Sequence, residues 1–96
     1  MYSAVRRYET DPKNVSEVKR RIEEEFVPII RKVSGFVSYE VLDAGNGVLA
    51  TISFFDSKTG AEESTQRAAD WVKTVRSLLP TPPQVTAGEI VVRNTK

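Results

Sequence analysis

The stretch GNGVLATISFFDS, residues 45–57, decides the fold, because it reads as a tight turn followed by a β-strand with two apolar faces. Asn-Gly at 46–47 is a strong hairpin signal, since both residues tolerate positive φ. From Val48 onward, Leu49 and Phe55 fall on one face, and the other face collects Val48, Ala50, Ile52 and Phe54. An antiparallel strand with one wet face should instead alternate apolar and polar residues. We therefore expect something to cover each face of this strand.

The stretch is the second half of a predicted hairpin in a regular series of elements. The preceding strand is expected over residues 36–43, with residues 44–47 as the loop. Two further runs, 2–9 and 84–93, are rich in β-branched or aromatic residues and also read as strands. The four strands are thus one at each end of the chain and a hairpin in the middle.

An amphipathic helix is predicted between the first two strands. Its apolar positions recur at spacings of three and four: Val15, Val18, Ile22, Phe26, Ile29 and Val33. Asn14 with Glu17 fits an N-terminal cap, and Gly35 lies just beyond the C-terminal end. Pro28 removes the hydrogen bond to Glu24, so we expect a kink near Phe26, or else two separate helices.

A second helix is predicted from a cap at Asp56 or Ser57 to about Leu79, where LPTPP ends it. Its expected inner face has Ala61, Thr65, Ala68, Val72, Val75 and Leu79, with Trp71 beside this stripe. The resulting order, β-α-β-β-α-β in an α+β chain, predicts a ferredoxin-like sandwich: a four-stranded antiparallel sheet with both helices on one face. Residues 1–96 form a single domain, because the chain has no room for two.

The face of the sheet opposite the helices is the expected site of assembly. In either register of the third strand that face is apolar, and soluble monomers seldom leave such a patch exposed. A second copy packed sheet to sheet in a homodimer is the simplest cover. Leu49 and Phe55 are the candidate interface residues. The alternative is that the spare apolar residues are scattered surface positions.

Composition excludes several classes of function. The 14 Lys plus Arg nearly balance 13 Asp plus Glu, so a net charge of +1 gives no reason to expect binding to nucleic acid or to a membrane. The chain contains no Cys and no His, which removes the usual ligands of zinc, copper and haem, and we expect no cofactor and no metal. RNA-recognition domains share the element order, but here Leu49 and Thr51 occupy the positions of their stacking aromatics. No apolar run is long enough for a membrane span, and a cytoplasmic location is the default expectation.

The run from Val27 to Val72, VPIIRKVSGFVSYEVLDAGNGVLATISFFDSKTGAEESTQRAADWV, carries a family resemblance. Its pointers are Gly35-Phe36, the hairpin at 43–47, Phe54-Phe55-Asp56 and Ala68-Ala69-Asp70-Trp71. The sequence resembles the dimeric α/β-barrel proteins of the antibiotic biosynthesis monooxygenase superfamily, in a subgroup of small and mostly uncharacterised bacterial proteins. The resemblance implies two sheets packed face to face, with a small-molecule cavity in each subunit between sheet and helices. It also implies chemistry such as cofactor-independent oxygenation of aromatic polyketides or quinols, haem degradation, isomerisation or decarboxylation.

Haem degradation in that superfamily depends on a histidine, so its absence here disfavours this activity. Cofactor-free oxygenation needs an ionised phenol or enol, a dry pocket and a donor or cation that stabilises the charge. The candidate catalytic residues are Trp71, Tyr39 and Arg7, with Arg6 as the alternative to Arg7, because adjacent strand residues point to opposite faces. Each also has a purely structural interpretation: Trp71 and Tyr39 as packing residues, and the arginines as partners of surface acids. Glu40 and Asp43 are the nearest strand acids, and neither stands out as a base.

The candidate pocket residues are Ser53, Thr51, Phe26 and Val72, the two small polar ones either softening a cavity wall or facing water. The predicted function is a cofactor-independent monooxygenase-like oxidoreductase that acts on a hydrophobic or aromatic small molecule. The alternative is a non-catalytic ligand-binding or structural dimeric domain, which the lack of evident acid and base residues favours.

Overall fold

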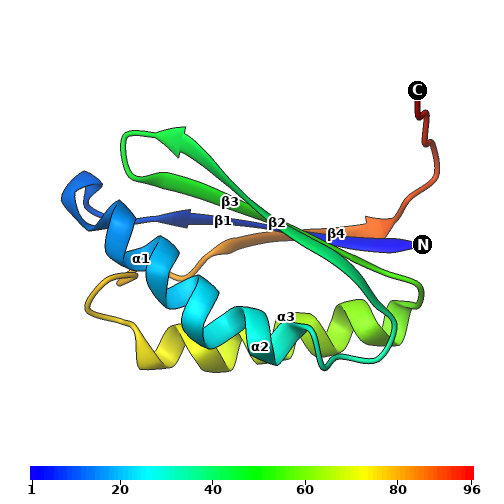
Figure 1. Cartoon of the computed structure of the whole chain (residues 1–96), viewed down its shortest axis with the longest axis horizontal. Helices are drawn as coiled ribbons and strands as arrows, with labels where there is room; N and C mark the ends of the chain where they lie inside the picture. Colours follow the sequence, from blue (N-terminus) through cyan, green and yellow to red (C-terminus); the bar gives the residue numbers. More distant parts are fainter.

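The computed structural model describes all 96 residues, Met1–Lys96, and places four strands in one antiparallel sheet (Figure 1). The strands are β1 (Tyr2–Glu9), β2 (Phe36–Gly45), β3 (Val48–Phe55) and β4 (Gln84–Glu89). Their spatial order is β2-β3-β1-β4, so the two central strands come from the start and the middle of the chain. Both helical segments lie on the same side of this sheet. The predicted α+β ferredoxin-like architecture is confirmed.

The first helical segment is irregular where Pro28 forced a departure from the ideal helix. A 3-10 turn, η1 (Pro12–Asn14), leads into α1 (Val15–Arg21), a π-helical turn η2 (Ile22–Phe26) and α2 (Val27–Ile30). Val27 N–H donates to the Ile22 carbonyl, one residue further back than in an α-helix. The expected kink near Phe26 is thus a π-helical turn. This turn accommodates Pro28, which has no N–H to donate within the helix.

The start of this segment differs from the prediction. Asn14 makes no side-chain capping bond, and Glu17 pairs with Arg20 on the helix surface instead of reaching back. Asp11 is the actual cap, and its carboxylate accepts from Lys13 N–H at 3.1 Å. The 3-10 turn that precedes the helix moved the cap three residues toward the N-terminus, which spacing alone does not reveal.

The hairpin is tighter than predicted. β2 continues to Gly45, so only Asn46 and Gly47 form the turn, with φ of 56° and 82°. Positive φ at both central residues matches the twist of the flanking strands. Gly47 also packs directly against the Thr10 carbonyl, which leaves no space for a Cβ. The hairpin tip is therefore fixed both by its own geometry and by the chain that leaves β1.

The two faces of β3 are sharply different. Leu49, Thr51, Ser53 and Phe55 are all completely buried, whereas the alternate residues are half-buried. Leu49 and Phe55 belong to the core between sheet and helices. Their assignment to a dimer interface is therefore wrong: the face that β3 presents outward carries Val48, Ala50, Ile52 and Phe54.

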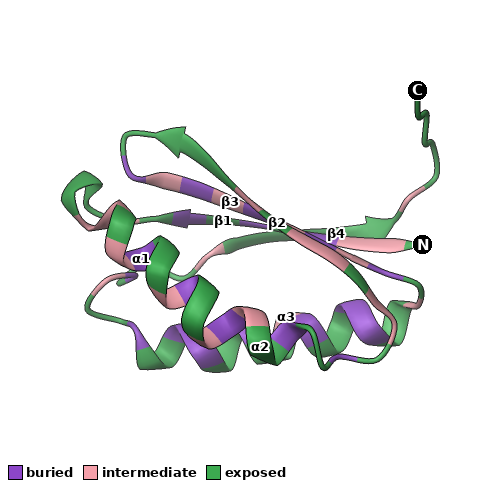
Figure 2. Ribbon diagram, viewed as in Figure 1, coloured by how far each residue is buried: buried purple, intermediate pink, exposed green.

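The core fills the layer between the sheet and the helices, as the burial colouring shows (Figure 2). The two helical segments and the turns after them contribute most of the predicted stripes, with the buried Ile30 in place of the exposed Ile29: Val18, Ile22, Phe26, Ile30, Val33, Ala61, Ala68, Val72, Val75 and Leu79. An aromatic cluster lies at its centre, with the Phe26 ring 5.5 Å from that of Trp71 and 5.6 Å from that of Tyr39. Burial of these apolar side chains is the main contribution to stability.

The second helix, α3 (Lys58–Thr74), begins as predicted and ends earlier. Ser57 is the cap, and its hydroxyl accepts from Gly60 N–H at 3.2 Å. After Thr74 the chain passes through a turn and the proline-rich segment to β4, which is exposed along its whole length. Leu79 still reaches the core from this connection. β4 ends at Glu89, and the segment beyond it runs away from the sheet (Figure 1).

One residue ties three connections together at the end of the sheet where β1 finishes. Thr10 N–H donates to the carbonyl of Gly47 at the hairpin tip, at 2.8 Å. Its hydroxyl donates to the carbonyl of Leu78, at 2.6 Å, in the connection that follows α3. The path from α3 to β4 is thereby attached to the rest of the sheet.

Candidate functional site

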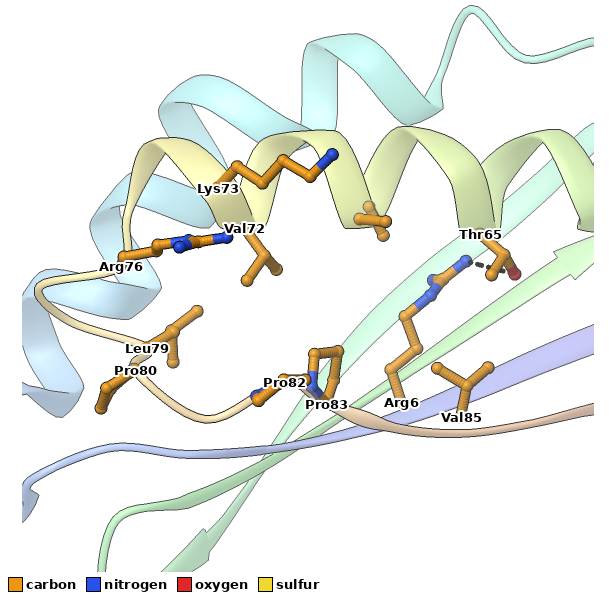
Figure 3. A pocket seen from close by; sticks show the side chains of 12 residues that line it. Arg6, Thr65, Val72, Lys73, Arg76, Leu79, Pro80, Pro82, Pro83 and Val85 are labelled. Atoms are coloured by element: carbon orange, nitrogen blue, oxygen red, sulfur yellow. Dashed lines mark hydrogen bonds between the residues drawn. The ribbon is translucent and has the colours of Figure 1, made fainter.

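A cleft of about 480 Å³ lies between α3, β4 and the proline-rich connection, as Figure 3 shows. Such a volume falls within the roughly 300–1,000 Å³ typical of small-molecule sites. Its lining comprises Arg6, Thr65, Ala68, Ala69, Val72, Lys73, Arg76, Leu79, Pro80, Pro82, Pro83 and Val85. We call this the α3/β4 cleft.

The sequence produces this cleft in two ways. Pro80, Pro82 and Pro83 offer no backbone N–H and fix φ, so the chain leaves α3 as an extended wall instead of packing down as another helical turn. β4 is an edge strand, and small residues such as Ala68 and Ala69 face it from α3. Small side chains on the helix and an exposed strand opposite leave space that the core does not fill.

A second hollow of about 370 Å³ continues the cleft toward the start of α3. The two share Thr65 and Val85, and the second adds Tyr2, Ala61, Ala87 and Gly88 with Lys58 and Glu62 at its outer end. Together they form one groove along α3 and β4, with Arg6 in the half nearer the prolines.

Arg6 is the most unusual side chain in the groove. It comes from the central strand β1, is only 1% exposed, and extends from the sheet toward α3 (Figure 3). One terminal nitrogen, Nη2, donates to the hydroxyls of Ser64 at 2.9 Å and Thr65 at 3.2 Å. Both hydroxyls in turn donate to the Ala61 carbonyl, so the helix presents them as acceptors to the arginine.

The rest of the Arg6 guanidinium has no partner. Its Nε and Nη1 atoms are buried without a hydrogen bond, and Arg6 is in none of the ion pairs of the molecule. Thr51, which pairs with Arg6 across β3 and β1, also has a buried hydroxyl without a hydrogen bond of acceptable geometry. Buried polar atoms are nearly always satisfied, so three on adjacent strands mark a functional candidate.

The electrostatic surroundings of Arg6 are neutral and aromatic. Burial lowers the pKa of Arg6, and the nearby Tyr8 and Tyr39 phenols partly offset that effect. Burial raises the pKa of Tyr8, and it raises the pKa of Tyr39 more strongly, with nearby Tyr8 adding to the rise and the adjacent Thr51 hydroxyl and Arg6 opposing it. Both phenols are therefore un-ionised at neutral pH and supply no negative charge to the guanidinium.

The rim of the cleft adds charge of the same sign. Lys73 and Arg76 line it from the end of α3, and no Asp or Glu is among the lining residues. Lys73 is 4.0 Å from Asp70 on the exposed surface, a contact of little energetic weight. The cleft thus combines apolar walls with three cationic side chains, a composition suited to an anion with an apolar body.

Trp71, a predicted catalytic residue, lies elsewhere. It is 6% exposed, packs on Phe26, and is not among the residues that line the cleft. Its indole N–H donates to Glu25 Oε1 at 3.0 Å. Glu25 is half-buried, and its pKa is lowered by the hydrogen bonds from Arg21 and Trp71. In this arrangement Trp71 joins the two helical segments.

Tyr39 and Arg7 are also separated from the cleft. Tyr39 lines a different hollow, between α1 and β2, together with Lys19, Ile22, Glu23, Val27, Val41 and Asp43. Arg7 is on the outer face of β1, where it pairs with Glu9 at 2.6 Å. The structure therefore does not bring the three proposed catalytic residues into one site, and Arg6 takes the inward position.

Of the four predicted pocket residues, Val72 alone lines the α3/β4 cleft. Phe26 belongs to the aromatic cluster of the core. Ser53 is buried and donates to the Ala4 carbonyl at 3.1 Å, so it is satisfied within the sheet. Thr51 lies in the sheet next to Arg6, without lining the cleft itself.

Alternation on the first strand could have identified the inward arginine. Ala4, Arg6 and Tyr8 share one face and are buried, while Val5, Arg7 and Glu9 share the exposed face. Tyr8 beside an apolar Ala4 indicates the inner register and therefore selects Arg6. The prolines of LPTPP were read only as a helix stop, and their role as a cleft wall was missed.

Two other properties bear on the kind of site. No group of three or more acidic side chains is gathered where it could hold a metal ion. None of the helices has the length and apolar character needed to cross a membrane.

No family model matches the chain, and no curated protein matches it. Solved structures do. A protein of unknown function from Nitrosomonas europaea superimposes with a TM-score of 0.80 at 18% identity, over 99% of this chain and 93% of that one. A monooxygenase from the ActVA-Orf6 gene of Streptomyces coelicolor, in complex with nanaomycin D, gives a TM-score of 0.80 at 19% identity, over 99% and 91%.

A further structure, described as an antibiotic biosynthesis monooxygenase, matches with a TM-score of 0.71 at 14% identity, over 96% of this chain and 100% of that one. Identities this low establish shared architecture and leave activity open. The resemblance seen in the sequence is thus confirmed for the fold. The chain has the β-α-β-β-α-β fold of the antibiotic biosynthesis monooxygenase structures and of relatives of unknown function over nearly its whole length.

Proposed function

We propose that the protein binds an aromatic small molecule in the α3/β4 cleft and oxygenates it without a cofactor. The observation that carries this proposal is the cleft itself, apolar on its walls and bordered by a buried guanidinium. The Streptomyces monooxygenase of the same fold, which was solved with nanaomycin D, supports an aromatic ligand in this architecture.

Cofactor-free oxygenation requires a substrate whose anion can itself reduce O₂. Anthrone is a simple probe, because loss of a proton gives an electron-rich aromatic enolate that reacts with O₂ at carbon. The peroxide formed at that carbon loses water and leaves a carbonyl group, so anthrone and O₂ give anthraquinone and water. Two C–H bonds break, one oxygen atom stays on carbon, and the substrate provides all four electrons. The role of the site is to hold the anion in a dry, preorganised environment.

Oxygen uptake with anthrone tests this proposal. Ala69 is exposed and lines the cleft, so Ala69→Trp should fill it without disturbing the core. Gln66→Trp, exposed on the same helix and outside the cleft, is the matched control. We expect one O₂ consumed per anthraquinone formed, with the rate lost in Ala69→Trp and kept in Gln66→Trp. A rate equal to that of the buffer alone would remove the oxygenase proposal.

A non-catalytic binding protein is the second candidate, and a specific observation favours it. The cleft contains no carboxylate or imidazole that could take the substrate proton, so nothing in it serves as a general base. Calorimetry with the same ligand and the same two variants separates the candidates. Binding that is lost in Ala69→Trp, without any oxygen uptake in the unmodified protein, would identify a binding module.

The assembly that we propose is a homodimer through the outer face of the sheet. This face carries Val5, Leu42, Val48, Ala50, Ile52 and Phe54. Leu42 is 52% exposed and Val5 is 39% exposed. An apolar surface of this kind is unfavourable in water and is typical of an interface. Arg7 and the acids Glu9 and Glu40 share the face, so a two-fold axis can set opposite charges against each other.

Light scattering tests the assembly. Ile52→Asp should convert the dimer into a folded species of 10.7 kDa, because it adds a charge to the outer face and leaves the core intact. Lys58→Asp, on the exposed start of α3, is the control and should leave the dimer unchanged. A species of 10.7 kDa from the unmodified protein at micromolar concentration would refute the dimer.

A further inference from the structure

The Arg6 guanidinium is a charge buried inside the subunit without a counterion. All six ion pairs of the molecule involve other residues and lie at the exposed or half-exposed surface. Arginine does not give up its proton in proteins, so the charge persists after burial. A buried charge with no partner is strongly destabilising in general, and a small domain has little stability to offset it.

The neighbouring groups do not neutralise this charge. Ser64 and Thr65 contribute two hydroxyl acceptors to Nη2 alone. The phenols of Tyr8 and Tyr39 are un-ionised, for the reasons given above. The outer face of the sheet is equally unable to help, because Arg6 points to the helix side and a second copy of the chain on the outer face would not touch it. A molecule that enters the cleft can supply the missing negative charge, because Arg6 lines it.

The unpartnered atoms lie together. Nε and Nη1 of Arg6 leave free N–H groups in the plane of the guanidinium, on the two edges that flank the bonded Nη2, and the Thr51 hydroxyl is on the directly paired residue of β3. Free N–H groups on a charged guanidinium match an anionic oxygen or a carboxylate, for which arginine is a preferred partner. The same atoms offer nothing to a neutral hydrocarbon.

We propose that Arg6 is the binding site for an anionic oxygen of the small molecule in the α3/β4 cleft, either a carboxylate or an ionised phenol or enol. Val72, Leu79 and Val85 contact the apolar body of this ligand, and Lys73 and Arg76 attract the anion at the rim. The inference rests on the proposed function, since the cleft must admit an aromatic ligand, and it specifies the charge of that ligand.

For an oxygenase, this assignment explains how a cleft without a base could still promote ionisation. A cation aligned with the substrate oxygen stabilises the enolate relative to the neutral form, so the proton can leave to water before O₂ reacts. For a binding module, the same contact selects aromatic acids over neutral analogues. In both cases Arg6 touches the ligand oxygen directly.

The experiment uses 4-nitro-1-naphthol, whose visible absorbance reports its ionisation. Titration of the complex should show the bound phenol ionising at a pH at least about one unit below that of the free compound, equivalent to roughly tenfold tighter binding of the anion. Arg6→Gln should abolish this shift, and Arg6→Lys should retain part of it, because lysine keeps the charge and loses the fork. Arg7→Gln, on the opposite face of the same strand, is the control and should leave the shift unchanged.

A second arm needs no variant and covers the case in which Arg6→Gln does not fold. Naphthalene-2-carboxylate should bind the unmodified protein at least about tenfold more tightly than 2-naphthamide, its neutral isostere. Inorganic phosphate should not displace the naphtholate at a comparable concentration, since it has no apolar body. Displacement by phosphate would overturn the assignment of an organic anion.

The two proposals fail in different ways. Equal binding of carboxylate and amide, or a bound phenol with an unshifted ionisation, overturns the role of Arg6 and leaves aromatic binding in the cleft intact. Absence of binding by every naphthalene probe overturns the proposed function, and the role of Arg6 falls with it.

Discussion

The two faces of the sheet come from the same strands but differ in their surroundings: one packs against the helices, and the other is left uncovered. On the inner face, Leu49 and Phe55 are fully buried under the helices, and Arg6 is buried with them. On the outer face, Ile52 and Phe54 are half-buried apolar residues without a cover, and Arg7 pairs with a surface acid. Adjacent residues of like chemistry therefore have different roles, because a strand sends successive side chains to opposite sides. Substitution of one residue in such a pair should therefore have a different effect from the same substitution of its neighbour.

The largest expected effect comes from the two phenylalanines that end β3. Phe55→Asp should prevent folding, since it places a carboxylate in a core position with no exposure. Phe54→Asp should leave the monomer folded and remove the dimer. Circular dichroism and light scattering measure the two outcomes. Similar behaviour of both variants would contradict the division of the sheet into a core face and an association face.

The second effect contrasts the two arginines. Arg6→Met removes an unpartnered buried charge, so the ligand-free protein should gain stability, by about 1–4 kcal/mol if the site behaves like other buried charges replaced by apolar residues. Arg7→Met should change stability by no more than about 0.5 kcal/mol, as is usual for exposed pairs. Urea unfolding of both variants checks this. A strongly destabilised Arg6→Met protein would indicate that the guanidinium is already satisfied.

The third effect concerns alkaline pH. Burial raises the pKa values of Tyr8 and Tyr39 in the folded protein, so an unfolded chain releases these protons first as the pH rises. The free energy of unfolding should therefore fall above the ordinary tyrosine pKa of about 10. Tyr39→Phe should weaken this dependence, because it removes the more strongly shifted of the two phenols. An unchanged alkaline profile in Tyr39→Phe would contradict the burial of that phenol.

The smallest effect is expected where the helix layer meets solvent. Glu25 accepts from Trp71 and Arg21, and these bonds lower its pKa. Glu25→Gln should therefore destabilise the protein slightly above the ordinary pKa of glutamate, and the difference should fade as the pH falls through the lowered value of the folded state. Thermal unfolding between pH 3 and 7 measures it. A constant difference across this range would exclude the carboxylate charge as its source.

Much of the fold follows from pattern. The stripes of the helices and the Asn-Gly turn predict the element order, and the order predicts the layers. Several boundaries escape this reasoning: a 3-10 turn moves the first cap to Asp11, β2 continues to Gly45, and α3 ends at Thr74. The pattern of residues 48–55 does not identify the inner face, since the buried face includes Thr51 and Ser53 while the outer face is wholly apolar. The pairing of β3 with Ala4, Arg6 and Tyr8 of β1 identifies it.

The site was less predictable than the fold. Trp71 and Tyr39 are residue types common in catalysis, yet their aromatic surface is used in the core. Arg6 stands out only when its hydrogen bonds are known, because the lack of partners is a property of space and not of sequence. The cleft likewise depends on how the prolines hold β4 apart from α3. The sequence shows that these prolines end the helix, but it does not show the path of the chain after them.

Thr10 lies outside the cleft, yet its two hydrogen bonds have a consequence for ligand selection. The hydroxyl holds Leu78, and the proline wall that begins two residues later starts from that anchor. The backbone N–H donates to the hairpin tip, so one residue connects the proline wall to the turn between β2 and β3. If the cleft binds a ligand as proposed, we expect substitution of Thr10 to alter the width of its entrance without changing a lining side chain.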